Sequence, residues 1–144
     1  MSENKKTILF LCTGNSCRSQ MAEGWAKHLE SDVLDSYSAG IEQHGLNPNA
    51  VRVMQEAGVD ISEHQSALLE ELPVSEFDYV ITLCGHAHET CPYFPGETFH
   101  FGFDDPPKLA RENETEEQKL DHYRRVRDEI KEFVNKLPSI IQEG

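Results

Sequence analysis

The sequence predicts one α/β domain over residues 1–144, in which a four-stranded parallel sheet carries helices on both faces. Short apolar runs, which are typical of buried parallel strands, alternate with longer stretches whose apolar residues recur at helical spacing. A length of 144 residues is close to the commonest domain size and is enough to bury a sizeable core. No linker, repeat or low-complexity segment divides the sequence.

The expected strands are short apolar stretches between turn residues. The first, Thr7–Leu11, and the third, Tyr79–Leu83, are nearly uninterrupted apolar runs. The second covers Asp35–Ser38 and is closed by Gly40, and the fourth is a short stretch at Thr98–Phe101. Because strands that alternate with helices form parallel sheets, their carboxyl ends lie on one rim, where ligands bind.

The expected helices are defined by their apolar spacing and by their termini. They cover Ser16–Leu29, Asn47–Gly58, Ala67–Leu72 and Thr115–Pro138. Pro48 near the first turn and Gly58 at the end delimit the second helix. A Thr-Glu-Glu-Gln capping box opens the last helix at Thr115, and Pro138 is expected to end it.

The overall charge and composition exclude several classes of protein. A formal net charge of −13 is the opposite of what a nucleic-acid-binding surface needs. No apolar run is long enough to span a membrane, and residues 1–6 have no signal-peptide pattern. We therefore expect a cytoplasmic protein, and we expect it to act as a monomer.

The stretch from Cys12 to Ser19 joins the first strand to the first helix and is expected to bind an anion. In such a loop the backbone N–H groups converge, and the positive end of the helix dipole adds to them. The same field would hold Cys12 as a thiolate. Arg18 presents a planar fork to two oxygens of a tetrahedral oxyanion, and Ser19 can donate a hydrogen bond to the sulfur. The residues expected to surround the anion are Thr13, Gly14, Asn15, Ser16, Cys17, Arg18 and Ser19.

The chain has four cysteines, which in a cytoplasmic protein more often serve catalysis or metal binding than structural disulfides. Cys84 directly follows the third strand, so it shares the rim of the sheet with Cys12. His86 and His88 lie between Cys84 and Cys91, and a zinc site is the alternative interpretation. The spacing is not that of a tight Cys-x2-Cys knuckle, which favours thiol chemistry over zinc.

The loop resembles the phosphate-binding loop of low-molecular-weight protein tyrosine phosphatases. A closer likeness, to the arsenate reductases built on that fold and recycled by thioredoxin, is carried by residues 10–26, FLCTGNSCRSQMAEGWA. The resemblance resumes in four later stretches, at Tyr37–Val51, Val80–Gly85, Gly102–Pro107 and Arg125–Ile130. It covers nearly the whole chain and implies an arsenic-detoxifying enzyme without a tightly bound cofactor.

The resemblance implies a role for each member of a thiol relay. Cys12 attacks arsenate, and Asp105, which precedes a proline, protonates the oxygen that leaves; Asp104 competes for that role. Cys84 then attacks Cys12, and arsenite is released as a Cys12–Cys84 disulfide forms. Cys91 attacks this disulfide in turn, and thioredoxin reduces the resulting Cys84–Cys91 disulfide.

The resemblance also implies a weak potassium site at Asn15, Glu23 and Ser38. The family's further acidic ligand aligns with Ala67, which has no side-chain oxygen, so the chain departs from the family pattern there. An alkali cation needs several oxygen ligands, and this departure weakens the site. No catalytic step is assigned to Cys17.

Two other functions stay open. The same loop would serve a protein tyrosine phosphatase, although no aromatic pair beside Asp105 offers a grip on a phenyl ring. Cys84 and Cys91 favour the reductase because a phosphatase needs one thiolate, whereas reduction needs two electrons from thiols. The third interpretation is a thiol redox sensor that binds a partner protein and turns over no substrate. Beside reduction, weak phosphatase activity on small aryl phosphates is expected.

Overall fold

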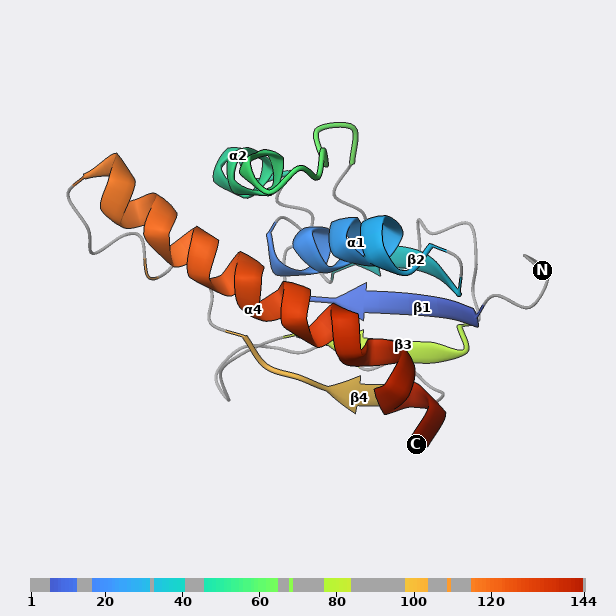
Figure 1. Cartoon of the computed structure of the whole chain (residues 1–144). Helices are drawn as coiled ribbons and strands as arrows, with labels where there is room; N and C mark the ends of the chain where they lie inside the picture. The colour runs from blue at the N-terminus through green and yellow to red at the C-terminus, as the bar shows by residue number, and fades with distance from the viewer. Residues whose placement is uncertain are drawn as a thin grey trace.

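The computed structural model of the chain describes residues 6–12, 17–31, 33–40, 46–64, 68, 77–83, 98–103, 109 and 115–143. Its helices and strands follow one another in the order β1 (Lys6–Leu11), α1 (Arg18–Leu29), β2 (Leu34–Ala39), α2 (Pro48–Glu56), β3 (Tyr79–Thr82), β4 (Thr98–His100) and α4 (Glu116–Glu143) (Figure 1). This alternation of strands and helices confirms the predicted α/β class with a parallel sheet.

The strands pair in the order β2-β1-β3-β4, and all three pairings are parallel. The central strand β1 contributes its buried apolar run, with Ile8 opposite Ser36 on β2 and Tyr79 on β3. After β1 the chain adds β2 on one side and later β3 on the other. The direction of winding therefore reverses between β1 and β3, and in such sheets ligands bind at the carboxyl ends of those two strands.

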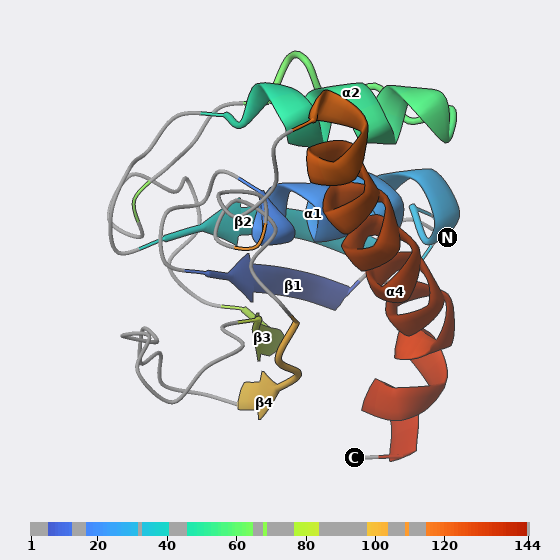
Figure 2. The same ribbon diagram turned by 90° about the vertical axis from the view of Figure 1, so that its left-hand side faces the viewer.

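Helices α1 and α4 lie side by side on one face of the sheet, and α2 packs against both of them (Figures 1 and 2). Ile8 and Phe10 of β1 are fully buried in the core that these helices form with the sheet. Trp25 of α1 is also buried, and its Nε1–H donates a hydrogen bond to the carbonyl of Arg127 on α4 at 3.2 Å. This packing fixes α1, and with it the residues at its start, against the carboxyl end of β1.

The opposite face of the sheet is also buried, through Leu9 and Leu11 of β1 with Val80 of β3. Tyr37 and Phe77 pack against this second cluster. The described helices α1 and α4 belong to the first face, so a helix over this second face stays a prediction.

Two of the expected helix boundaries are confirmed by their caps. Asn47 accepts hydrogen bonds from the backbone N–H groups of Asn49 and Ala50 and caps α2. The capping box of α4 is also formed, because Thr115 and Gln118 each bind the other's backbone N–H through their side chains.

One expected helix end is wrong, and one residue expected in a helix lies in a β-bridge instead. Pro138 does not end the last helix, since α4 continues to Glu143. The fixed φ of proline is itself helical, so a helix anchored by the buried Val134 and Leu137 can continue at the expense of one backbone hydrogen bond. Leu68, expected inside a short helix over residues 67–72, instead forms a parallel bridge with Gly40; the other residues of that helix lie outside the described ones.

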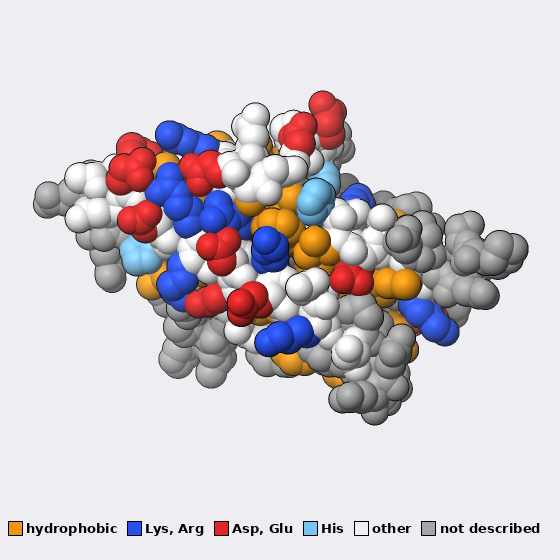
Figure 3. All heavy atoms as spheres, in the orientation of Figure 1, with side chains coloured by type: hydrophobic (Ala, Val, Ile, Leu, Met, Phe, Trp, Pro, Cys, Tyr) orange, Lys and Arg blue, Asp and Glu red, His pale blue; other side chains and the backbone are white. Residues whose placement is uncertain are grey.

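The exposed side of α4 carries acidic and basic side chains next to one another (Figure 3). The guanidinium of Arg124 donates to Glu56 at the end of α2 and to Glu117 and Asp121 of its own helix, each at 2.9 Å. These ion pairs fasten α2 to α4. None of the described helices combines the length and the apolar character that crossing a membrane requires.

Candidate active site

Cys12 lies directly after β1, at the point where the winding of the sheet reverses. Its backbone N–H donates to the carbonyl of Ala39 on β2 at 3.3 Å, and the N–H of Leu83 donates to Leu11 at 2.8 Å. Cys12 is 3% exposed. The backbone of Leu11 and Cys12 is therefore bonded to the end of β2 and to the residue after β3, at the rim where ligands bind in sheets of this kind.

The sulfur of Cys12 lies 2.9 Å from the hydroxyl oxygen of Ser19, which stands in the first turn of α1 and is fully buried. When the sulfur is a thiolate it has no proton to give, and the Ser19 hydroxyl donates this hydrogen bond. The contact expected between these two side chains is present. A donor fixed in this way stabilises a negative charge on the sulfur.

Arg18, the first residue of α1, is 4% exposed although arginine is rarely buried. Its Nη1 donates to the backbone carbonyl of Leu83 at 3.3 Å and to that of Phe103 at 3.1 Å. These two acceptors follow β3 and β4, so the guanidinium reaches across the carboxyl ends of the sheet. These carbonyl acceptors orient the guanidinium, and a planar fork held in a fixed direction suits the binding of an oxyanion.

Several residues predicted to be functional lie outside the described part of the chain: Thr13, Gly14, Asn15, Ser16, Cys84, Cys91, Asp104 and Asp105. Their roles remain predictions. The structure nevertheless describes the residues that lead into two of these segments, because Leu83 precedes Cys84 and Phe103 precedes Asp104. The carbonyls of both bind Arg18.

Cys17 is described and is buried at the start of α1, 3% exposed, where its carbonyl accepts the N–H of Met21 at 2.9 Å. Its place in the core fits a packing role.

Glu23 of α1 and Ser38 of β2, two of the residues expected to bind potassium, are in contact through a hydrogen bond from the Ser38 hydroxyl to Oε1 of Glu23. The other oxygen, Oε2, forms an ion pair with Lys27. The residues do not fit a potassium ion well, because an ammonium already binds this carboxylate and Ala67 supplies no oxygen. The described residues hold no cluster of three His, Cys, Asp or Glu side chains that could bind a metal.

The sequence interpretation missed three residues around this carboxylate: Lys27, Gln20 and His64. The Nδ1–H of His64 donates to Oε1 of the buried Gln20 at 3.0 Å. Burial lowers the pKa of His64, and the Lys27 charge lowers it further, against opposite effects of Glu23 and Asp60. Lys27 could have been found from its position four residues after Glu23 on a helix, whereas the approach of His64 depends on the tertiary fold.

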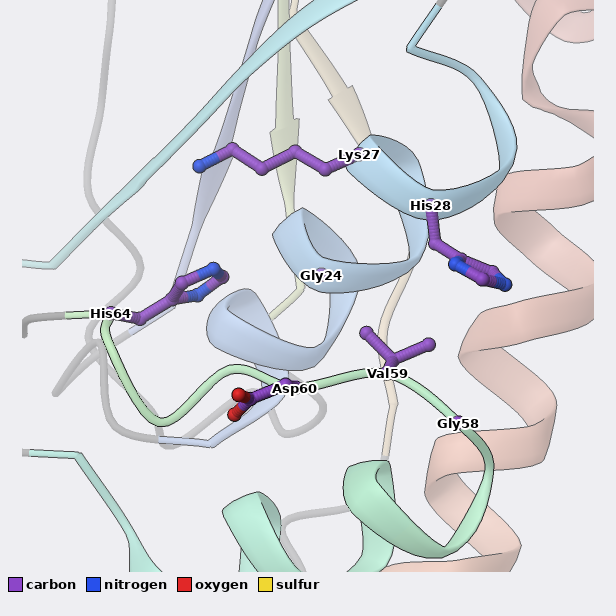
Figure 4. A pocket seen from close by; sticks show the side chains of 7 residues that line it. All are labelled: Gly24, Lys27, His28, Gly58, Val59, Asp60 and His64. Atoms are coloured by element: carbon purple, nitrogen blue, oxygen red, sulfur yellow. The ribbon is translucent and has the colours of Figure 1, made fainter.

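A surface pocket of about 230 Å³ lies beside α1 (Figure 4). It is lined by Gly24, Lys27, His28, Gly58, Val59, Asp60 and His64. Figure 4 shows that Lys27 and His28 extend to opposite sides of α1, so the basic side chains do not converge on one ligand. A Cβ added to Gly24 would lie 2.7 Å from Cγ2 of Ile61, which shows how closely the segment after α2 approaches the helix.

The chain is similar to several proteins that are named arsenate reductases. The arsenate reductase of Halalkalibacterium halodurans is 57% identical over 129 residues, 88% of this chain and 91% of its own. That of Bacillus subtilis is 54% identical over 141 residues, 96% of this chain and 97% of its own. A solved arsenate reductase in the reduced state is 34% identical and superposes with a TM-score of 0.73, over 94% of this chain and 98% of its own.

The family described as low molecular weight phosphotyrosine protein phosphatase matches residues 7–144, from β1 to the end of the chain. The match thus includes Cys12, Arg18 and Ser19 together with the described sheet except Lys6, the first residue of β1. The chain belongs to the low molecular weight phosphotyrosine protein phosphatase family.

Proposed function

We propose that this protein is an arsenate reductase that serves arsenic detoxification. The observation that carries the proposal is the joint placement of Cys12, Ser19 and Arg18 at the reversal point of the sheet. A buried thiol with a hydroxyl donor lies there beside an oriented guanidinium, which is the set of groups that nucleophilic attack on an oxyanion requires. Relatives at 57% and 54% identity, both named arsenate reductase, support arsenate as the oxyanion.

In the first step the Cys12 thiolate attacks the arsenic of arsenate, and a sulfur–arsenic bond forms as one oxygen leaves. Ser19 holds the sulfur, and Arg18 binds two of the arsenate oxygens in the geometry of a planar fork. Asp105 donates the proton that the departing oxygen takes up. Arg18 supports this role of Asp105, because it binds the carbonyl of Phe103, two residues earlier.

In the second step the Cys84 thiolate attacks the sulfur of Cys12. The sulfur–arsenic bond breaks and its electron pair stays with arsenic, so arsenic is reduced by two electrons and two thiols are oxidised to a disulfide. Cys91 then attacks Cys84, freeing Cys12 and leaving a Cys84–Cys91 disulfide that thioredoxin reduces. The bond from Arg18 to Leu83, the residue before Cys84, supports the approach of this thiol to Cys12.

Cysteine variants separate the steps of this relay. Cys91→Ser should release one arsenite per protein molecule and then stop as the Cys12–Cys84 disulfide, because the exchange that regenerates Cys12 is missing. Cys84→Ser should release no arsenite, and Cys17→Ser should turn over repeatedly as a matched control. Arsenite counted against NADPH in a thioredoxin-coupled assay gives these numbers, and repeated turnover by Cys91→Ser would exclude the three-cysteine relay.

The proposed role of Asp105 as the general acid is tested by replacing its carboxyl group with an amide, which cannot donate the proton. Asp105→Asn should lower kcat for arsenate by about 10²–10⁴-fold, the usual contribution of a general acid. Asp104→Asn is the control and should stay near the wild-type rate. The reverse pattern in steady-state kinetics would assign the proton transfer to Asp104.

A second activity, hydrolysis of small aryl phosphates, is favoured by the family match and by the same anion site. Phosphoryl transfer to Cys12 needs no second thiol. Cys12→Ser should therefore abolish this hydrolysis, whereas Cys84→Ser and Cys91→Ser should retain it. Since the relay needs reduced thiols, we expect the reaction to take place in the cytoplasm, and we propose that a monomer carries it out.

A further inference from the structure

The carboxylate of Glu23 joins two elements beside the active site. One oxygen accepts the hydroxyl of Ser38 on β2, and the other binds the ammonium of Lys27 one turn further along α1. The Glu23 side chain is only 13% exposed, whereas that of Lys27 is 51% exposed. The lysine thus reaches the carboxylate from the solvent side of the helix.

A mostly buried carboxylate needs a compensating positive charge, because it has lost much of its hydration. An alkali cation would supply that charge only in the fraction of molecules to which it is bound, and that fraction depends on the cation concentration. Lys27 supplies the same unit charge from four residues along the helix, in the favourable order of glutamate before lysine. The alanine at position 67 removes an oxygen ligand that a cation would need and that an ammonium does not.

We propose that the Lys27 ammonium is the resident counter-ion of Glu23 and takes the place of the potassium ion that the family resemblance implies, so that this protein works without potassium. Lys27 is a positioning residue in this account, since it acts through Glu23 and Ser38.

The position of Ser38 explains how this pair bears on the active site. Ser38 precedes Ala39, whose carbonyl accepts the backbone N–H of Cys12. Glu23 stands one turn after Ser19, which binds the sulfur of Cys12. The Glu23–Ser38 bond therefore fastens the start of α1 to the end of β2 on either side of the thiol. Loosening it should weaken arsenate binding and leave the chemical step intact.

His64 provides an independent reporter of the charge at this position. The groups that act on it are Glu23 and Lys27 of α1 and Asp60 of its own segment, and Gln20 is its hydrogen-bond partner. Figure 4 shows Lys27 and His64 on the same side of α1. Because the Lys27 charge lowers the pKa of His64, loss of that charge should raise it.

The test compares wild type, Lys27→Gln and Lys119→Gln in potassium chloride and in choline chloride of equal ionic strength. Lys119 is the matched control because it also pairs with a glutamate of its own helix, at 3.9 Å, far from this site. Wild type and Lys119→Gln should unfold at the same temperature in both salts. Lys27→Gln should unfold about 2–4 °C lower than wild type in both salts, because Glu23 then lacks its counter-ion and potassium cannot replace it without the oxygen that is missing at position 67.

Two further measurements use the same proteins. By NMR, the pKa of His64 in Lys27→Gln should be raised relative to wild type in both salts, because the Lys27 charge that lowers it is gone. The KM for arsenate of this variant should rise about 2–5-fold in both salts, with kcat unchanged.

The KM measurement rests on the proposed arsenate reduction, whereas the unfolding and NMR measurements do not. If the protein does not reduce arsenate, the unfolding temperatures and the pKa of His64 still test the role of Lys27. Potassium-specific stabilisation of the wild type or of Lys27→Gln, or a Lys27→Gln variant as stable as Lys119→Gln in both salts, would overturn the proposal.

Discussion

Arg18 and Arg124 show two opposite uses of an arginine in this protein. Arg18 is 4% exposed, and its Nη1 donates to two neutral carbonyls. The Arg124 side chain is 26% exposed, and it binds the carboxylates of Glu56, Glu117 and Asp121. The hydrogen bond to Glu56 is the largest of several effects that raise the pKa of Arg124.

The difference separates an arginine that joins two helices from an arginine that is oriented at the candidate site. Three carboxylates neutralise Arg124, so its role is to hold α2 against α4. Two acceptors of Arg18 are backbone carbonyls that follow β3 and β4, and they orient its guanidinium at the site where we propose that an oxyanion binds. In a chain with a net charge of −13, the anion site depends on such a local arrangement, because the overall field repels the substrate.

The largest effect should come from exchanging each arginine for lysine. Arg18→Lys should lose most of the arsenate reductase activity, since an ammonium cannot reproduce a bidentate grip. Arg124→Lys should keep its activity, because that residue lies on the α2–α4 contact. Comparable kcat/KM values for the two variants in the coupled assay would show that the burial of Arg18 has no functional meaning.

A smaller effect is expected at the sulfur. Ser19→Ala removes the hydroxyl that lies 2.9 Å from Cys12 and should lower kcat/KM by about 10–100-fold, the equivalent of one hydrogen bond to a charged group. Circular dichroism should show an unchanged fold, because the substitution preserves the helix. An unchanged rate would mean that the thiolate is stabilised by the loop alone.

The smallest effect should be a change in stability at Arg124. The pKa of Glu56 is lowered from its ordinary value of 4.5, chiefly by its hydrogen bond to Arg124. The pair therefore stabilises the fold above that pH, and its contribution disappears as the pH falls through the lowered pKa. Thermal unfolding of Arg124→Gln should be slightly easier than that of wild type at pH 7 and equal to it at lower pH. A difference that grew on acidification would contradict this assignment.

Much of the fold was predictable because its signals are local. The apolar run before Cys12, the Asn47-Pro48 start of α2 and the capping box at Thr115 each fix an element within a few residues. The prediction that Pro138 ends the last helix was wrong because the tertiary packing of α4 outweighs the local preference of proline to end a helix. The prediction that Leu68 is helical was wrong for the same reason, since its bridge to Gly40 joins residues that are distant in the sequence.

The candidate site likewise contains residues that local sequence signals identify and residues that only the tertiary structure reveals. Cys12, Arg18 and Ser19 could be found from one loop, because the groups that bind an anion there are consecutive in the chain. The carbonyls of Leu83 and Phe103 could not, since any backbone carbonyl looks alike in a sequence. Lys27 was overlooked because a lysine four residues after a glutamate is ordinary on a helix. Its proposed role becomes visible only in the tertiary structure, where Lys27 and Ser38 bind the same carboxylate, that of Glu23.

We propose that the site around Cys12 and Arg18 reduces arsenate. The most direct measurement is arsenite formation by the purified protein with thioredoxin, thioredoxin reductase and NADPH, with arsenate present or absent. We predict one arsenite for each NADPH consumed, no arsenite from Cys12→Ser, and no NADPH consumption without arsenate. If the wild type hydrolysed an aryl phosphate but formed no arsenite, the site would be that of a phosphatase. If it did neither and only cycled its disulfide, it would be a redox sensor.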